Sequence, residues 1–206
     1  MHIPSHFKVE DPALIDEFIR QNSFGTLVSI GESYPLATHI PIELEVNAAG
    51  HQVLWGHISK ANPQWQTFET NPKVLAIFLS PIDHYISSSW YFHENVPTWN
   101  YMSVQVTGTL QLLTGEALEE SLRRLMNKYE SISAKPVDFD GLTASVKRQI
   151  HGIIGFEISI DRKEASFKLS QNRTLEDFNN VLAQLRATGD QTALRMAQIM
   201  EKARPL

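Results

Sequence analysis

One short segment groups side chains that could bind a phosphate. Residues 55–65 read Trp-Gly-His-Ile-Ser-Lys-Ala-Asn-Pro-Gln-Trp, and within them His57, Ser59 and Lys60 offer an imidazole, a hydroxyl and an ammonium group. A strand end followed by a helix start at Asn62-Pro63 would place these donors beside free backbone amides, which suits an anion. Composition alone favours a solvated Lys60 and a Ser59 that caps the helix. The residue types leave both interpretations open.

Two further stretches crowd aromatic rings and polar groups. Residues 87–91 read Ser-Ser-Ser-Trp-Tyr and residues 96–101 read Val-Pro-Thr-Trp-Asn-Tyr, with little regular periodicity. This composition is typical of a binding loop, because flat aromatic rings stack well on large planar π-systems. Aromatic side chains more often belong to a core, so a binding role needs a further observation.

Composition excludes several kinds of chemistry. The chain has no cysteine, so disulfides, thiolate catalysis and iron–sulfur clusters are ruled out, and a redox role needs an added cofactor. It lacks the glycine-rich dinucleotide loop, the Walker lysine loop, and the HExxH and GxSxG motifs, and its histidines are scattered. We therefore expect no metal site. The formal net charge of −5 disfavours contact with nucleic acid unless one face is locally basic.

Nothing in the sequence predicts a membrane segment or secretion. The opening residues lack the basic and apolar regions of a signal peptide, and no apolar stretch approaches the ~20 residues that span a bilayer. We expect a cytoplasmic protein. With 42% hydrophobic and 20% charged residues, the composition is that of a globular protein, and 206 residues suffice for one sizeable core.

The elements that must position these groups follow strand and helix periods. Strands with a period of two are predicted near residues 24–30, 36–42, 53–57, 74–79, 103–112 and 154–160. Helices are predicted near residues 11–19, 61–70 and 118–129 and after Thr174 and Asp190. The connections between the early strands are too short for parallel crossovers. The chain therefore has the pattern of a mainly β, α+β fold: an antiparallel β-barrel with helical additions.

Four segments together resemble a known family. They are residues 1–7, residues 55–65, residues 96–101 and residues 168–173, the last reading Lys-Leu-Ser-Gln-Asn-Arg. In this order, and over nearly the whole chain, they resemble the PaiB-type family of FMN-binding negative transcriptional regulators. The resemblance implies an antiparallel FMN-binding split β-barrel of the pyridoxamine-phosphate-oxidase-like type.

The implied architecture is a single domain over residues 1–206. We expect a helical insertion at about 115–150 and C-terminal helices at about 174–203.

The resemblance also implies which residues bind FMN. Basic and hydroxyl groups hold the phosphate in such barrels, so Lys60 is the expected phosphate cation, with His57 and Ser59 as nearby donors. Gln105, on the polar face of its strand, is expected to hydrogen-bond the edge of the flavin ring. The other candidates for the cofactor site are Asn62, Thr26, Ser29, Trp99, Asn100, Tyr101 and Arg173. Asn62 keeps an alternative role as a helix cap, and Arg173 as an ordinary charge beside a helix.

A homodimer with FMN between its protomers is the assembly that the resemblance implies. The polar strand face with Gln105, and the aromatic segment before it, have no obvious cover within one chain, and a second protomer would cover them. A regulatory role, with DNA or another partner, follows from the family alone.

Two other functions stay open. A small flavin-dependent oxidoreductase is one, because the isoalloxazine carries the electrons itself. A haem-binding split barrel that uses His39 or His84 is the other. No catalytic acid–base pair is evident, so the sequence does not decide whether the chain is an enzyme.

Overall fold

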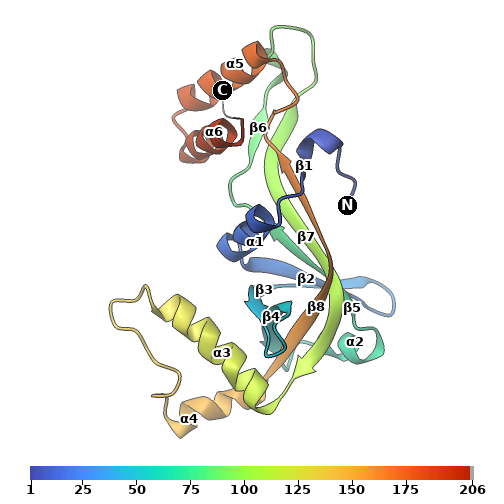
Figure 1. Cartoon of the computed structure of the whole chain (residues 1–206), viewed down its shortest axis with the longest axis vertical. Coiled ribbons are helices and arrows are strands. Elements are labelled where there is room, and N and C mark those ends of the chain that lie inside the picture. The colour runs from blue at the N-terminus through green and yellow to red at the C-terminus, as the bar shows by residue number, and fades with distance from the viewer. Residues whose placement is uncertain (205–206) are drawn as a thin grey trace. The chain divides into compact units, whose positions relative to one another are not determined.

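The computed structural model describes residues 1–204, which divide into two compact units. The barrel unit comprises Ile19–Ile77 and Val106–Lys163, and the terminal unit comprises Met1–Phe18, Phe78–Gln105 and the residues from Glu164 onward. Two long strands, β7 (Thr98–Leu113) and β8 (Ile153–Lys168), contribute to both units (Figure 1). The single domain stays a prediction, and the last two residues of its predicted range lie outside the described residues.

The barrel unit is a closed antiparallel barrel. Its strands follow the order β8-β4-β3-β2-β5-β7, and a further pairing of β7 with β8 closes the ring. Between the long strands lie β2 (Phe24–Ile30), β3 (Pro35–Val46), β4 (Gln52–Ser59) and β5 (Lys73–Leu79). Short turns join β2 to β3 and β3 to β4, as the predicted hairpins require. The predicted antiparallel barrel is therefore confirmed.

Apolar side chains fill the inside of this barrel. Alternate residues of β3 and β4 point inward, and among them Ile42 and Leu54 are 0% exposed. Other buried apolar residues on the barrel strands are Leu27, Ile58, Val106, Leu110, Phe156 and Ile158. A barrel of about eight strands is just wide enough for its own side chains or for one small ligand, and this ring has fewer strands. A planar cofactor must therefore bind outside this smaller barrel.

Helix α3 (Gly115–Glu130) covers part of the outer face of the barrel. Lys128 Nζ lies 2.5 Å from Glu43 Oε2, and the Tyr129 hydroxyl donates to Glu43 Oε1 at 2.8 Å. Arg124 forms an ion pair with Glu45 at 3.1 Å. Glu43 is 6% exposed, and a carboxylate buried to that extent needs such partners. These contacts hold α3 over the part of the face formed by β3 and β4.

The predicted helical insertion continues after α3. It contains α4 (Ala144–Lys147) and the short 3-10 helix η3 (Arg148–Gly152), which leads into β8. The side chain of Thr143 accepts a hydrogen bond from the Val146 amide and caps α4.

In the terminal unit, short strands extend the long ones and two helices pack together. The 3-10 helix η1 (Ser5–Phe7) precedes β1 (Lys8–Val9), which pairs with β8, and β6 (His84–Ile86) pairs with β7. Helix α1 (Pro12–Gln21) follows β1, and a 3-10 helix, η2 (Ser88–Trp90), follows β6.

The predicted C-terminal helices are present as α5 (Leu175–Ala187) and α6 (Gln191–Ala203), which lie side by side (Figure 1). Thr174 and Asp190 cap them, as the sequence predicts. No helix within residues 1–204 is both long and apolar enough to cross a membrane.

Two element predictions are wrong in part. The sequence predicts a loop over residues 96–101, yet β7 begins at Thr98, because Trp99 pairs with Tyr85 of β6 and aromatic pairs favour strands. The helix predicted over residues 61–70 is shorter: α2 spans Trp65–Thr70, since the residues before it form a hydrogen-bonded turn.

The contact between β7 and β8 leads to a stability prediction. A Cβ added at Gly108 would lie 2.4 Å from the Ser159 carbonyl oxygen and 2.5 Å from Ile158 Cγ2. Because backbone atoms cannot move aside cheaply, Gly108→Ala should lower the free energy of unfolding by about 1–3 kcal/mol. Urea unfolding followed by circular dichroism measures this change.

Gly141→Ala is the matched control. A Cβ there would meet only the Asp138 carbonyl oxygen, at 3.5 Å. This substitution should be neutral or stabilise the fold by about 0.4–1 kcal/mol. Equal losses of stability in the two variants would contradict the close approach at Gly108.

Candidate functional site

The outer face of β2 and β3 carries an apolar surface that α3 leaves accessible. Phe24 and Ile30 point outward and are 69% and 57% exposed. Phe24 and Ile30 have their ladder neighbours on β3, whereas Thr26 and Val28 between them have neighbours on both β3 and β5. We call the following set the open face: Phe24, Thr26, Val28, Ile30, Pro35, Ala37, His39, Leu75 and Ile77. Contiguous exposed apolar residues of this kind mark an interaction or ligand site.

A polar pair lies within the open face. Thr26 Oγ1 is 2.8 Å from His39 Nδ1, directly across the ladder between β2 and β3. The predicted candidate Thr26 is thus accessible from outside the barrel. His39, expected from the sequence only as a candidate haem ligand, lies beside it. Counting outward from the turn at residues 31–34 would have placed the two residues opposite each other.

Strand β4 brings two predicted phosphate donors to the outer side of the same sheet. His57 and Ser59 alternate with the inward-facing Ile58, so they share a face with Trp55. Ser59 is exposed, and its Oγ accepts a hydrogen bond from the Ala61 amide at 3.2 Å. Its hydroxyl hydrogen therefore remains able to donate.

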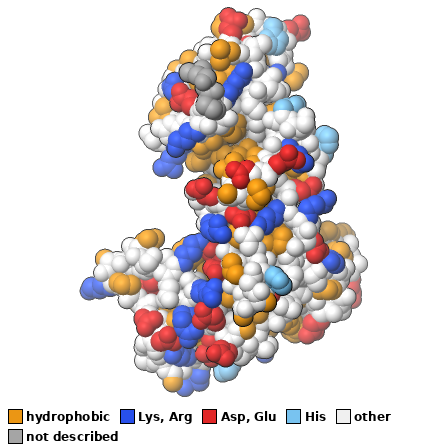
Figure 2. Space-filling view, viewed as in Figure 1, with side chains coloured by type: hydrophobic (Ala, Val, Ile, Leu, Met, Phe, Trp, Pro, Cys, Tyr) orange, Lys and Arg blue, Asp and Glu red, His pale blue; other side chains and the backbone are white. Residues whose placement is uncertain are grey.

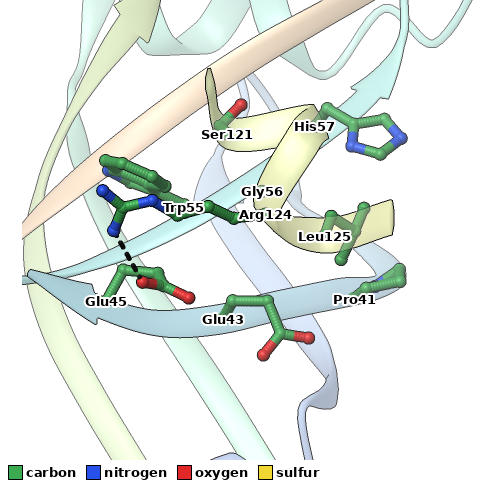
Figure 3. A pocket seen from close by; sticks show the side chains of 9 residues that line it. All are labelled: Pro41, Glu43, Glu45, Trp55, Gly56, His57, Ser121, Arg124 and Leu125. Carbon is green, nitrogen blue, oxygen red and sulfur yellow. Dashed lines mark hydrogen bonds and ion pairs between the residues drawn. The ribbon is translucent and has the colours of Figure 1, made fainter. Parts of the chain in front are cut away.

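His57 lies at a small pocket between β4 and α3. The residues that line this pocket include Ser121, Arg124 and Leu125 of α3, and Figure 3 shows the His57 ring beside this helix. Burial lowers the pKa of His57, which favours the neutral imidazole. Unfolding rehydrates the ring, so His57 lowers the stability of the fold as pH falls through the ordinary histidine range.

Lys60 lies in a turn whose backbone amides already have partners. The Lys60 amide donates to Gly152 O at 2.8 Å, the Asn62 amide to Ser59 O at 2.9 Å, and the Gln64 amide to Asn62 Oδ1 at 3.0 Å. These three amides are therefore used within the protein, and free amides at the start of α2 stay a prediction. The exposed Lys60 ammonium makes no hydrogen bond or ion pair with residues 1–204, so it is available to an anion.

Asn62 and Ser29 are linked by Gln64, a buried residue whose role no sequence pattern indicates. Ser29 Oγ accepts from Gln64 Nε2 at 3.2 Å, on the opposite side of β2 from Thr26. Asn62 Nδ2 donates to Thr38 Oγ1 at 2.9 Å, and the Thr38 hydroxyl donates to Gln64 Oε1. Asn62 and Ser29 thus shape the turn, and their direct contact with FMN stays a prediction.

The remaining predicted candidates belong to the terminal unit. Asn100 is 0% exposed, and its Nδ2 donates to Ser170 Oγ at 2.9 Å and contacts Met200 Sδ at 3.4 Å. This buried amide joins β7 to the segment that follows β8. Ser170 has a φ of 61°, in the left-handed region, and its hydrogen bond to Asn100 supports that unusual conformation.

Aromatic contacts organise the rest of this group. The exposed Trp99 packs edge-on against Tyr85, with ring centres 6.0 Å apart. The Arg173 guanidinium carbon lies 4.5 Å from the centre of the Tyr91 ring, a cation–π contact. Tyr101 and Gln105 are half-buried. The roles of Trp99, Asn100, Tyr101, Gln105 and Arg173 in binding FMN stay predictions.

Comparison with known proteins identifies the family. The family model described as "Putative FMN-binding domain" matches residues 1–162. A protein of Bacillus subtilis (strain 168) named "Protease synthase and sporulation protein PAI 2" is 41% identical, over 98% of this chain and 97% of its own length. "Uncharacterized protein AN0679" of Emericella nidulans is 27% identical, over 92% of each chain.

Solved structures share the barrel fold. The flavocytochrome Anf3 from Azotobacter vinelandii aligns with a TM-score of 0.62 at 16% identity, over 86% of this chain and 78% of that one. The FAD and heme binding protein from Mycobacterium smegmatis aligns with a TM-score of 0.61 at 15% identity, over 78% and 73%. These likenesses confirm the predicted split barrel. Together with the family match, they show that this chain belongs to the FMN-binding split-barrel family that its sequence resembles, with FMN as the cofactor.

Proposed function

We propose that the chain holds FMN on the open face, between the two protomers of a homodimer, and acts as an FMN-dependent regulator. The observation that carries this proposal is the position of the open face beside the phosphate donors on one sheet. The face offers an accessible apolar surface with one polar pair, Thr26 and His39. Such a surface suits a planar ring system with polar edges.

The phosphate would be held by side chains at the end of β4. Lys60 supplies a cation, Ser59 a hydroxyl and His57 a ring N–H, and charge-assisted hydrogen bonds to phosphate are the stronger kind. The open face and these donors belong to the same unit, so one protomer offers both an anion site and a surface for the ring. FMN, when bound, supplies redox chemistry that the cysteine-free chain lacks.

A second protomer would cover the ring and the open face together. An exposed apolar surface is costly in a monomer, and a two-fold axis brings the same surface of two chains together. FMN that binds the dimer more tightly than the monomer would stabilise the dimer by mass action.

The regulatory part of the proposal rests on the relative from Bacillus subtilis. Its name concerns protease synthesis and sporulation. Figure 2 shows acidic and basic side chains interspersed over the part of the visible face where α3 and α4 lie, and the net charge is −5. These charges disfavour direct phosphate contacts with DNA, so we favour a change in protein contacts that follows FMN occupancy. A cytoplasmic location is part of this proposal.

Absorption spectroscopy of the purified protein tests the cofactor, and activity assays test the role. The proposal expects flavin bands, whereas a haem Soret band would support the haem alternative. Steady oxidation of reduced nicotinamide would support an oxidoreductase instead of a regulator. Promoter binding that resists salt would support direct contact with DNA.

The phosphate donors lead to a binding prediction. FMN should bind more tightly than riboflavin, and Lys60→Ala should weaken FMN binding by about 1.5–3 kcal/mol without changing riboflavin binding. Quenching of flavin fluorescence measures both affinities. Lys135→Ala, which removes an exposed lysine from the loop after α3, makes the same charge change and should have no effect. Unchanged FMN affinity in Lys60→Ala would remove Lys60 from the site.

The burial of His57 leads to a prediction of how FMN affinity depends on pH. A phosphate dianion nearby favours the imidazolium that burial disfavours, so binding should take up a proton at His57. FMN affinity should therefore rise as pH falls from about 8 to about 6, a range that includes the ordinary histidine pKa. His57→Gln should flatten this rise, whereas protonation of the FMN phosphate lowers the affinity and does so in both proteins. Parallel profiles for the two proteins would place His57 away from the phosphate.

The proposed role of the open face as the dimer contact leads to a prediction of the oligomeric state. Ile30→Lys places a charge on that face at an exposed position, so it should leave the barrel folded but shift the protein to monomer and weaken FMN binding. Ile132→Lys is the matched control, since Ile132 is exposed in the loop after α3 and should tolerate lysine. Light scattering and fluorescence titration measure the two effects. An Ile30→Lys monomer that still binds one FMN with full affinity would contradict the shared site.

A further inference from the structure

Gln64 is a buried amide that joins two strands near the proposed phosphate site. Its side chain is 2% exposed. Gln64 Nε2 donates to Leu27 O at 3.1 Å, Ser29 Oγ at 3.2 Å and Leu36 O at 3.1 Å. Two hydrogens serve three acceptors, so one hydrogen is shared. The acceptors lie on β2 and at the start of β3, so Gln64 is attached to the hairpin that carries the open face.

The other end of the Gln64 side chain is connected to the turn that contains Lys60. Gln64 Oε1 accepts from the Thr38 hydroxyl, and Thr38 Oγ1 accepts from Asn62 Nδ2 at 2.9 Å. Asn62 Oδ1 in turn accepts a hydrogen bond from the backbone amide of Gln64 at 3.0 Å. These partners fix the orientation of the side-chain amides of Asn62 and Gln64, because each amide nitrogen faces an acceptor and each amide oxygen faces a donor.

A third link reaches the helix that follows the turn. Ser29 Oγ, which accepts from Gln64, also accepts from Thr67 Oγ1 of α2 at 2.7 Å. A buried polar side chain is costly unless its partners are all present, so this set of partners allows little displacement of the turn. The turn that contains Lys60 is therefore held to the hairpin by the contacts of Asn62 and Gln64, and α2 is held to it by the contact of Thr67.

We propose that Gln64 is a positioning residue for flavin recognition. Through Thr38 and Asn62 it holds Lys60 and Ser59 at a fixed place relative to the open face, and so sets the preference for FMN over riboflavin. Gln64 itself is buried, so it acts through these partners and not by touching the flavin. This inference rests on the FMN site proposed above.

The test is the ratio of the affinities for FMN and riboflavin in Gln64→Met. Methionine keeps the length and the apolar contacts but removes all the hydrogen bonds of the side chain. FMN affinity should fall roughly tenfold, which corresponds to about 1.4 kcal/mol, with riboflavin affinity nearly unchanged. A role in stability alone would lower the melting temperature and change both affinities alike. Gln66→Met, at an exposed position of α2, is the matched control.

Thr38→Val provides a second variant if Gln64→Met does not fold. Valine has the shape of threonine without the hydroxyl, so it breaks the link to Asn62 and leaves the Nε2 contacts of Gln64 in place. The ratio of FMN affinity to riboflavin affinity should fall, as in Gln64→Met. An unchanged ratio in folded Thr38→Val would overturn the positioning role. A wild-type protein with equal affinities would instead overturn the phosphate site, and this inference with it.

Discussion

A barrel whose interior is filled by its own side chains can bind a planar cofactor only on its outside, and the rest of this structure depends on that constraint. Residues such as Ile42 and Leu54, which are 0% exposed, fill that interior. The outer face is then divided. The buried carboxylate of Glu43, held by Lys128 and Tyr129, keeps α3 over one part and leaves the open face accessible. In the proposed dimer, the open face would serve both FMN binding and the contact between the protomers.

Polar groups around the open face have distinct roles that follow from which side of a strand they occupy. Thr26 and Ser59 point outward, where a ligand can reach them, whereas Ser29 points inward and joins Gln64. Because the Lys60 turn is attached to the β2–β3 hairpin through Gln64, the proposed phosphate donors and the proposed surface for the ring are joined by buried hydrogen bonds. Preorganisation of this kind lowers the entropic cost of binding.

The sequence predicts strands and their faces better than contacts between distant residues. A period of two assigns His57 and Ser59 to one face of β4, and it would also have separated Ser29 from Thr26. It could not find Gln64, whose partners lie 26 to 37 residues away, or the pairing of α3 with Glu43 across 85 residues. The strand at Trp99 looks like a loop in the sequence because its partner β6 is only three residues long. Nor does the sequence show that the backbone amides of Lys60, Asn62 and Gln64 have partners within the protein.

The crystal structure of the FMN-loaded protein tests this account most directly. We expect two FMN molecules in a two-fold dimer, each with its phosphate within hydrogen-bond distance of Ser59 and Lys60 and its ring against the open face, covered by the partner chain. FMN bound to a lone protomer, or with its phosphate away from the Lys60 turn, would contradict it.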